Sequence, residues 1–114
     1  MNLIFKIAGA AEWRRAEAAG VFAGAGVDLS DGYIHLSTAE QVAETAAKWF
    51  AGRTDLVLAA VDADTLGADL RWEPSRGGAL FPHLYAPLHL TVVRWTRAMP
   101  LGPDGRHELG RLTA

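Results

Sequence analysis

The sequence predicts one α+β domain that combines small mixed or antiparallel sheets with two main helices. Residues 56–61 form an unbroken apolar run between two aspartates, which is typical of a strand buried on both faces at the centre of a sheet. Residues 10–19 and 37–51 carry helical patterns. The chain has 114 residues, which is enough for one domain with a real hydrophobic core.

The N-terminal part is predicted to contain a strand, a helix and a loop. Residues 3–7 are apolar and β-prone, so we expect a strand that begins almost at the terminus. Residues 10–19 are rich in alanine, and Gly20 follows at a position where glycine commonly ends a helix. Residues 21–30 contain glycines without a clear hydrophobic period, which predicts a loop.

The stretch DGYIHLST, residues 31–38, organises the rest of the chain. Its first two residues suit a turn, residues 33–36 suit a short strand, and a helix is expected from Ser37 to about residue 51. Two pairs have the capping-box spacing that marks a helix start: Ser37 with Glu40, and Thr38 with Gln41. One apolar stripe of this helix is expected to face the central strand: Val42, Ala46, Trp49 and Phe50.

The second half of the chain is predicted to alternate strands with turns. In order, we expect a short turn or single helical turn at 62–67, a strand at 70–73 ended by Pro74, a flexible loop at 75–78, an irregular loop or short edge strand at 80–90, and a strand at 90–99. Pro82 and Pro87 favour the loop or edge, because proline cannot donate a ladder hydrogen bond. Residues 101–114 are expected to form a polar C-terminal tail after a domain of residues 1–100.

Composition excludes several classes of function. The formal net charge of −2 argues against nucleic-acid binding by bulk charge. The chain has no cysteine, which excludes disulfides, thiolate zinc sites and a cysteine nucleophile. Charged residues interrupt the first 20 positions, and no apolar run approaches the roughly 20 residues that span a bilayer. We therefore expect a cytoplasmic protein without a signal peptide or membrane span, and the sequence does not indicate its oligomeric state.

The first group of candidate site residues lies on one face of residues 33–38. In an extended segment side chains alternate, so Tyr33, His35 and Ser37 share a face opposite Ile34 and Leu36. A helix beginning at Ser37 and Thr38 would place unpaired N–H groups beside the imidazole, which suits a small anion or phosphate. The plainer alternatives are a histidine hydrogen-bonded within the core, and hydroxyls that only cap the helix.

The second group lies in GGALFPHLYAPL, residues 77–88. If this stretch is extended, His83 and Tyr85 share a face, with Leu84 opposite, and this pair could stack on and hydrogen-bond to a base or ribose. An aromatic loop packed over a sheet edge is the equal alternative. Glu73 could act as a general acid or base, or it could be a surface residue paired with nearby Arg76.

We expect both groups to face one cleft, although they are far apart in sequence. Each histidine shares its face with a tyrosine and has an apolar neighbour that can anchor its segment in the core. A metal site is conceivable from these residues: His35, His83, His89 and Glu73. None of their spacings is typical of metal ligands, so no metal is expected.

Long strings of the sequence resemble a bacterial family of small single-domain proteins. They are DGYIHLSTAEQVAETA, LVLAAVDADTLGADLRWEPSRGGALFPHLY and APL. The family is the domain of unknown function nine-five-two, and the resemblance spans nearly the whole chain. It implies an ADP-ribosyltransferase-like α+β fold, whose enzymes bind NAD in a cleft between two small sheets.

The resemblance also implies roles for particular residues. His35 looks like the strand histidine that touches the nicotinamide ribose, and Tyr85 could be the tyrosine that stacks on nicotinamide. The late glutamate of the pattern is absent from residues 90–99, and Glu73 could replace it only if the fold brings it to the cleft. Without such a carboxylate, the oxocarbenium-like transition state would lack its electrostatic partner.

The sequence therefore predicts a polar cleft for an NAD-like or other nucleotide or phosphorylated ligand. The predicted catalytic residues are His35, Glu73 and Tyr85, and the predicted ligand-binding residues are Tyr33, Ser37, Thr38, Arg76, Phe81 and His83. If the protein is an enzyme, a glycosyl or ADP-ribosyl transfer is expected. The alternative is a non-enzymatic module that binds a small ligand or a protein.

Overall fold

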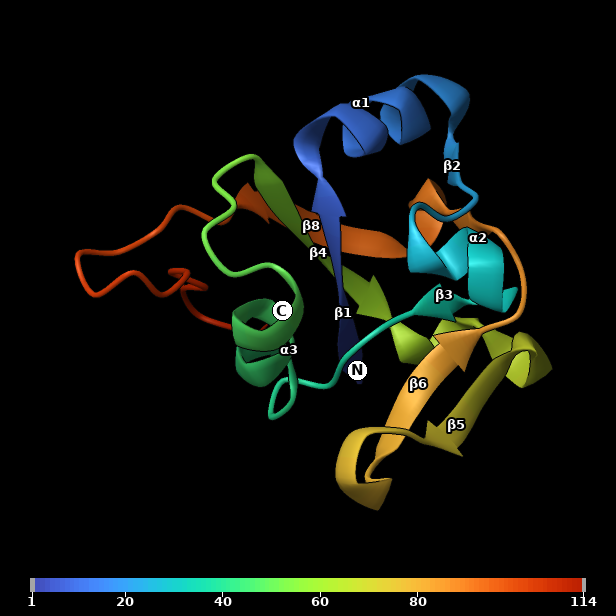
Figure 1. The fold of residues 1–114 in the computed structure, drawn as a ribbon. Coiled ribbons are helices and arrows are strands. Elements are labelled where there is room, and N and C mark those ends of the chain that lie inside the picture. Colours follow the sequence, from blue (N-terminus) through green and yellow to red (C-terminus); the bar gives the residue numbers. More distant parts are fainter. Residues whose placement is uncertain (1, 114) are drawn as a thin grey trace.

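The largest sheet has the predicted buried strand at its centre. The computed structural model describes residues 2–113, apart from the side chain of Arg76. The antiparallel strands have the order β1-β4-β8: β1 (Leu3–Gly9), β4 (Leu56–Asp62) and β8 (Val93–Ala98) (Figure 1). Leu58, Ala59, Ala60 and Val61 have no exposed surface. The prediction of a central strand at 56–61 is confirmed.

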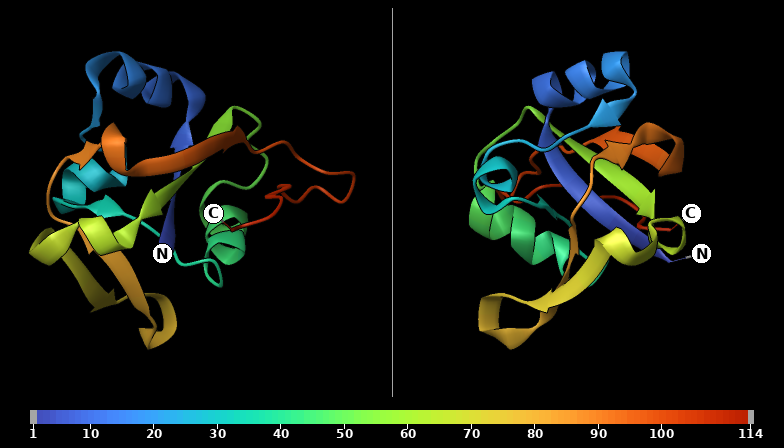
Figure 2. Two further views of the ribbon diagram at one scale, coloured as in Figure 1. Left: turned by 180° about the vertical axis from the view of Figure 1, so that it is seen from behind. Right: turned by 90° about the vertical axis from the view of Figure 1, so that its right-hand side faces the viewer.

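Two smaller antiparallel sheets complete the β-structure. One has the order β3-β6-β5 and the other pairs β2 with β7: β3 (Ile34–His35), β6 (Leu80–Leu84), β5 (Leu70–Pro74), β2 (Val21–Phe22) and β7 (Leu88–His89). The protein is thus a small α+β domain with antiparallel sheets. Figure 2 shows that β5 and β6 lie at the end of the molecule opposite the first helix, α1 (Ala10–Ala19).

The expectation of a loop or edge strand at 80–90 is wrong, because β6 is the middle strand of its sheet. Pro82 is tolerated there for a geometric reason. The Leu36 N–H donates to the Pro82 carbonyl at 3.1 Å, so the backbone of Pro82 faces the β3 side. The amide and carbonyl of one antiparallel residue point to the same neighbour. The missing proline N–H therefore removes no bond to β5.

Within residues 2–113, three α-helices and four short 3₁₀ turns connect the strands. The bounds of α1 match the prediction, and Gly20 ends it with a left-handed φ of 79°. Residues 21–30 are not a loop, because they contain β2 and the short helix α2 (Val27–Asp31). A five-residue helix is too short to produce a hydrophobic period. The 3₁₀ turns are η1 (Ala63–Thr65), η2 (Gly67–Asp69), η3 (Arg76–Gly78) and η4 (Leu90–Val92).

Helix α3 (Val42–Trp49) begins five residues later than expected. Ser37 continues the extended chain instead, because its backbone forms a bridge with Phe5 of β1, with N···O distances of 2.7 and 2.9 Å. Half of one predicted capping box is present, since Gln41 Oε1 accepts from the Thr38 N–H at 3.0 Å. Competition from pairing with β1 thus delays the helix.

The predicted apolar stripe of α3 is only partly buried. Val42 and Ala46 lie in the core, and Phe50 is half-buried against it. Trp49 is 67% exposed, so its predicted place in the core is wrong. Trp49 lies in the last turn of this short helix. Its side chain lines a cavity and does not join Val42 and Ala46 in the core.

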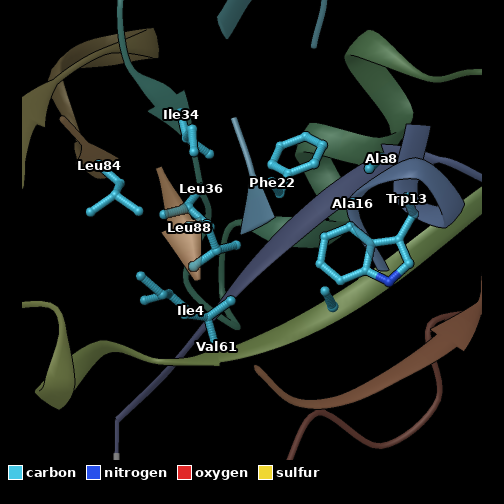
Figure 3. Packing of buried hydrophobic residues seen from close by; sticks show 11 residues of the cluster. Ile4, Ala8, Trp13, Ala16, Phe22, Ile34, Leu36, Val61, Leu84 and Leu88 are labelled. Atoms are coloured by element: carbon cyan, nitrogen blue, oxygen red, sulfur yellow. The ribbon is translucent and has the colours of Figure 1, made fainter. Parts of the chain in front are cut away.

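Alternation along β1 and β4 places one hydrophobic cluster on each face of the main sheet. Residues of α1 and the small sheets cover one face (Figure 3): Trp13, Ala16, Phe22, Ile34, Leu36, Leu84 and Leu88. Helix α3 and Met99 cover the other, and Leu109 and Leu112 from the C-terminal segment pack against it. Among residues 2–113, no helix has the length and apolar character needed to cross a membrane.

Candidate functional site

Two histidines stand side by side on neighbouring strands. His35 of β3 pairs with His83 of β6 in register, and their ring centroids are 5.5 Å apart. Ile34, Leu36 and Leu84 point into the core cluster, which holds both strands in place. The prediction that the two imidazoles share a face is confirmed. His83 is 4% exposed, so its ring is buried beside His35.

A buried carboxylate orients His35. Asp28 Oδ1 lies 2.7 Å from His35 Nδ1 and also accepts the His35 backbone N–H at 3.0 Å. The second oxygen, Asp28 Oδ2, accepts from Lys6 Nζ at 2.8 Å and from the Ala25 N–H at 3.1 Å. The Asp28 side chain is only 2% exposed, and Lys6 Nζ also donates to the His35 carbonyl at 3.1 Å. Backbone and side chain of His35 are thus both held.

Sequence reasoning missed Asp28 because it lies in the segment expected to be a loop. Lys6 was the available signal, since a lysine within a buried apolar strand requires a nearby acidic partner. The identity of that partner depends on the tertiary fold, because Lys6 and Asp28 are 22 positions apart.

The charge of Asp28 decides the hydrogen-bonding role of His35 Nδ1. Burial by itself raises the pKa of Asp28, but hydrogen bonds from His35 and the charge of Lys6 outweigh it and lower the pKa to about 2. Burial lowers the pKa of Lys6, and Asp28 opposes that change. Because ionised Asp28 can only accept, His35 Nδ1 is the donor. His35 Nε2 lies 3.0 Å from Oδ2 of half-exposed Asp31, another carboxylate that can accept from the ring.

A second carboxylate holds His83 in the same way. Glu73 Oε1 accepts from His83 Nδ1 and from the Tyr85 hydroxyl, each at 2.8 Å. These two hydrogen bonds lower the pKa of Glu73, and donation to Glu73 raises the pKa of Tyr85. The Arg71 guanidinium lies 4.3 Å from the centre of the Tyr85 ring. Glu73 therefore links His83 to Tyr85.

Tyr33 joins the two histidine pairs into one aromatic cluster. Its ring stacks on His83 at 4.2 Å between centroids and lies 4.6 Å from His35 and 5.0 Å from Tyr85. Burial raises the pKa of Tyr33, and the negative charges of Asp31 and Glu73 add to this effect.

The cluster stands at one side of a cavity of about 470 Å³. Five predicted site residues line it: Tyr33, His35, Ser37, Phe81 and His83. Thr38 lines a different cavity, of about 630 Å³, and Glu73 and Tyr85 line neither of the two. Arg76 was also predicted, and its side chain lies outside the described residues. The structure thus places five of the predicted residues at one cavity, and it places Thr38, Glu73 and Tyr85 away from that cavity.

The structure does not place Ser37 at a helix N-terminus where it could help to bind an anion. Ser37 is 4% exposed, and its Oγ lies 3.0 Å from Thr45 Oγ1 of α3. The helix N-terminus lies beyond both predicted hydroxyls. Across residues 2–113, no group of three or more histidine, aspartate or glutamate side chains is arranged to hold a metal ion.

Fold and site together define a class: a small α+β domain with two carboxylate–histidine pairs on adjacent strands. The chain belongs to the family described as protein of unknown function (DUF952), whose model matches residues 7–96. This confirms the family predicted from the sequence strings, whereas the ADP-ribosyltransferase type of fold remains a prediction.

The chain is similar to solved structures of one bacterial protein. The crystal structure of protein CC0527 from Caulobacter crescentus is 56% identical, with 95% of each chain covered and a TM-score of 0.91. The solution NMR structure of CC0527 is 56% identical, with 96% of this chain and 95% of that one covered and a TM-score of 0.86. No curated protein matches the chain.

Proposed function

We propose that the cavity beside His35 binds a nucleotide-like ligand, with NAD as the first candidate. One observation carries this proposal: the in-register pair of His35 and His83, joined by Tyr33, faces a cavity of about 470 Å³. Cavities of this size hold small molecules and combine an apolar lining with a few oriented polar groups. A sugar diol with an attached ring system fits that combination.

In this proposal His35 contacts a ribose hydroxyl through Nε2. Asp28 holds the other ring nitrogen in place, so a ribose hydroxyl could replace Asp31 as the hydrogen-bond partner of Nε2. Asp31 stands beside it, and acidic side chains commonly bind ribose hydroxyls in nucleotide sites. Glu73 acts through His83, and Tyr85 acts through Glu73, rather than on the ligand, because both lie outside the cavity lining. The family resemblance implies that Tyr85 stacks on nicotinamide. This proposal gives Tyr85 no direct contact with the ligand.

A second candidate is an enzyme that breaks the bond between nicotinamide and ribose. The observation that favours it is the Asp31 carboxylate in the cavity, 3.0 Å from His35 Nε2. A carboxylate there could stabilise positive charge on the ribose as the C–N bond breaks. Neutral nicotinamide would leave, the oxygen of water or of an acceptor hydroxyl would bond to the ribose carbon, and the proton of that hydroxyl would pass to the Asp31 carboxylate.

Isothermal titration calorimetry with NAD tests binding. We expect the wild type to bind NAD, His35→Ala to weaken binding at least tenfold, and His89→Ala to leave it unchanged. His89 is the matched control because it is an exposed histidine on β7 that does not line the cavity. Circular dichroism must show both variants folded. Absence of heat with NAD, ADP-ribose and AMP would refute the proposal.

Chromatographic detection of nicotinamide separates the two candidates. Release of nicotinamide by the wild type, and its loss in Asp31→Asn with NAD still bound, would establish the enzyme. Binding of NAD without release would identify a non-enzymatic ligand-binding module. Failure of binding would leave the protein-interaction alternative.

A further inference from the structure

The cavity that contains His35 also has an aromatic side formed by α3. Trp49 lines it and is 67% exposed, although the helix pattern would bury this residue. Phe50 and Arg53 line the same cavity, and its polar lining includes Lys6, His35 and the carboxylates of Glu12, Asp28 and Asp31. The exposed indole ring offers a flat surface on which a ligand ring can stack.

Two cationic side chains line the cavity, Lys6 and Arg53, and they differ in how readily they could bind a ligand anion. Lys6 is buried and bonded to Asp28 at 2.8 Å and to the His35 carbonyl at 3.1 Å, so it has little capacity for a new anion. Arg53 is 44% exposed, and its Nε lies 3.4 Å from exposed Asp55. Such a solvent-exposed pair is weak. The Arg53 guanidinium can therefore turn to a ligand anion with little loss, while Lys6 cannot.

The Arg53 guanidinium also lies close to the aromatic side. Its central carbon is 5.7 Å from the centre of the Phe50 ring, and the Arg53 carbonyl accepts from His107 Nε2 at 2.7 Å. The backbone at Arg53 is thus held by the C-terminal segment, although the side chain is exposed. An anchored backbone with a weakly paired guanidinium suits recognition of a phosphate, which arginine binds through several N–H groups.

We propose that Trp49 and Arg53 form a base-and-phosphate subsite, in which the base stacks on Trp49 and a phosphate pairs with Arg53. This inference rests on the proposed function, because it places the ribose of the same ligand toward His35. The proposal assigns a ligand contact to Trp49, which the apolar stripe of the helix had predicted to be a core residue. Every base has a flat face that can stack on an aromatic side chain. The subsite therefore recognises the face of the base and does not depend on hydrogen bonds to its edge.

Calorimetric titrations with three ligands distinguish the stacking contact from the phosphate contact: AMP, ribose 5-phosphate and adenosine. Trp49→Ala should weaken AMP and adenosine about tenfold or more and leave ribose 5-phosphate unchanged, because only the stacking contact is lost. Trp49→Phe should restore part of the loss. Arg53→Gln should weaken AMP and ribose 5-phosphate and leave adenosine unchanged, because only the phosphate contact is lost.

Trp72→Ala is the matched control. Trp72 is also an exposed tryptophan, at 46%, but it lines the other cavity. Its removal should leave all three titrations unchanged. Thermal unfolding must show that every variant has a cooperative transition, so that weaker binding reflects the subsite and not the fold.

Two results would overturn the subsite and leave the proposed function intact. The first is AMP binding that is lost in His35→Ala but unchanged in Trp49→Ala and Arg53→Gln. The second is a dimer in sedimentation velocity that Trp49→Ala dissociates without changing AMP affinity, which would assign the exposed ring to a second copy of the chain. If the wild type binds none of NAD, ADP-ribose, AMP, adenosine and ribose 5-phosphate, both the subsite and the proposed function are wrong.

Discussion

Replacement of Asp28 by asparagine removes the charge on which the buried polar network depends. Asp28 accepts four hydrogen bonds within 3.1 Å, two from His35 and one each from Lys6 and Ala25. The side chains of Lys6 and Asp28 are 8% and 2% exposed. Removing one partner of a buried pair leaves the other charge uncompensated and typically costs about 3–5 kcal/mol. We expect Asp28→Asn to lower the free energy of unfolding by about 3 kcal/mol at pH 7.

The pH dependence of this loss has a defined sign. The pKa of Asp28 is lowered from the ordinary 3.8 to about 2 in the folded protein. At about 1.4 kcal/mol per pKa unit, the difference corresponds to about 2 kcal/mol of stability. A lowered carboxyl pKa contributes stability above the unfolded-state pKa and loses it as the pH falls through the folded-state pKa. The gap between wild type and Asp28→Asn should therefore shrink between about pH 4 and pH 2.

Urea unfolding followed by circular dichroism at several pH values measures both effects. Asp31→Asn is the matched control, because the Asp31 side chain is 48% exposed and should cost less than about 1 kcal/mol. The slope of unfolding free energy against urea must be the same in all variants. A loss under about 1 kcal/mol for Asp28→Asn at pH 7, or a gap that does not change with pH, would refute the reasoning.

Two further predictions test the placement of the aromatic residues. Trp49→Ala should lower the free energy of unfolding by less than about 1 kcal/mol, and Trp13→Ala by about 3–5 kcal/mol, because Trp13 is 3% exposed within a core cluster; equal losses in urea unfolding would contradict this contrast. Glu73→Gln should lower the pKa of Tyr85 and of Tyr33, since the charge of Glu73 raises both. Ultraviolet titration of the tyrosinate band would measure the shift, and unchanged midpoints would show that Glu73 does not act on these rings.

Local patterns by themselves determined the elements whose side chains repeat regularly. The apolar run of 56–61 predicted the central strand, and the alanine-rich segment with Gly20 predicted both ends of α1. Alternation in DGYIHLST placed His35 opposite Ile34, and the same rule placed His83 opposite Leu84. These features depend on neighbours within a few positions, so the sequence carries them directly.

The tertiary structure decided which distant segments meet. Pairing of Ser37 with β1 delayed α3, and the position of β3 allowed Pro82 in a central strand. The partner of Lys6, the second carboxylate at His35 and the cavity beside Trp49 also follow from contacts between separate elements. Strand register and helix ends set these contacts, and both depend on competing pairings across the whole chain. The residues of the site were therefore partly predictable from the sequence, while its network and its cavity were not.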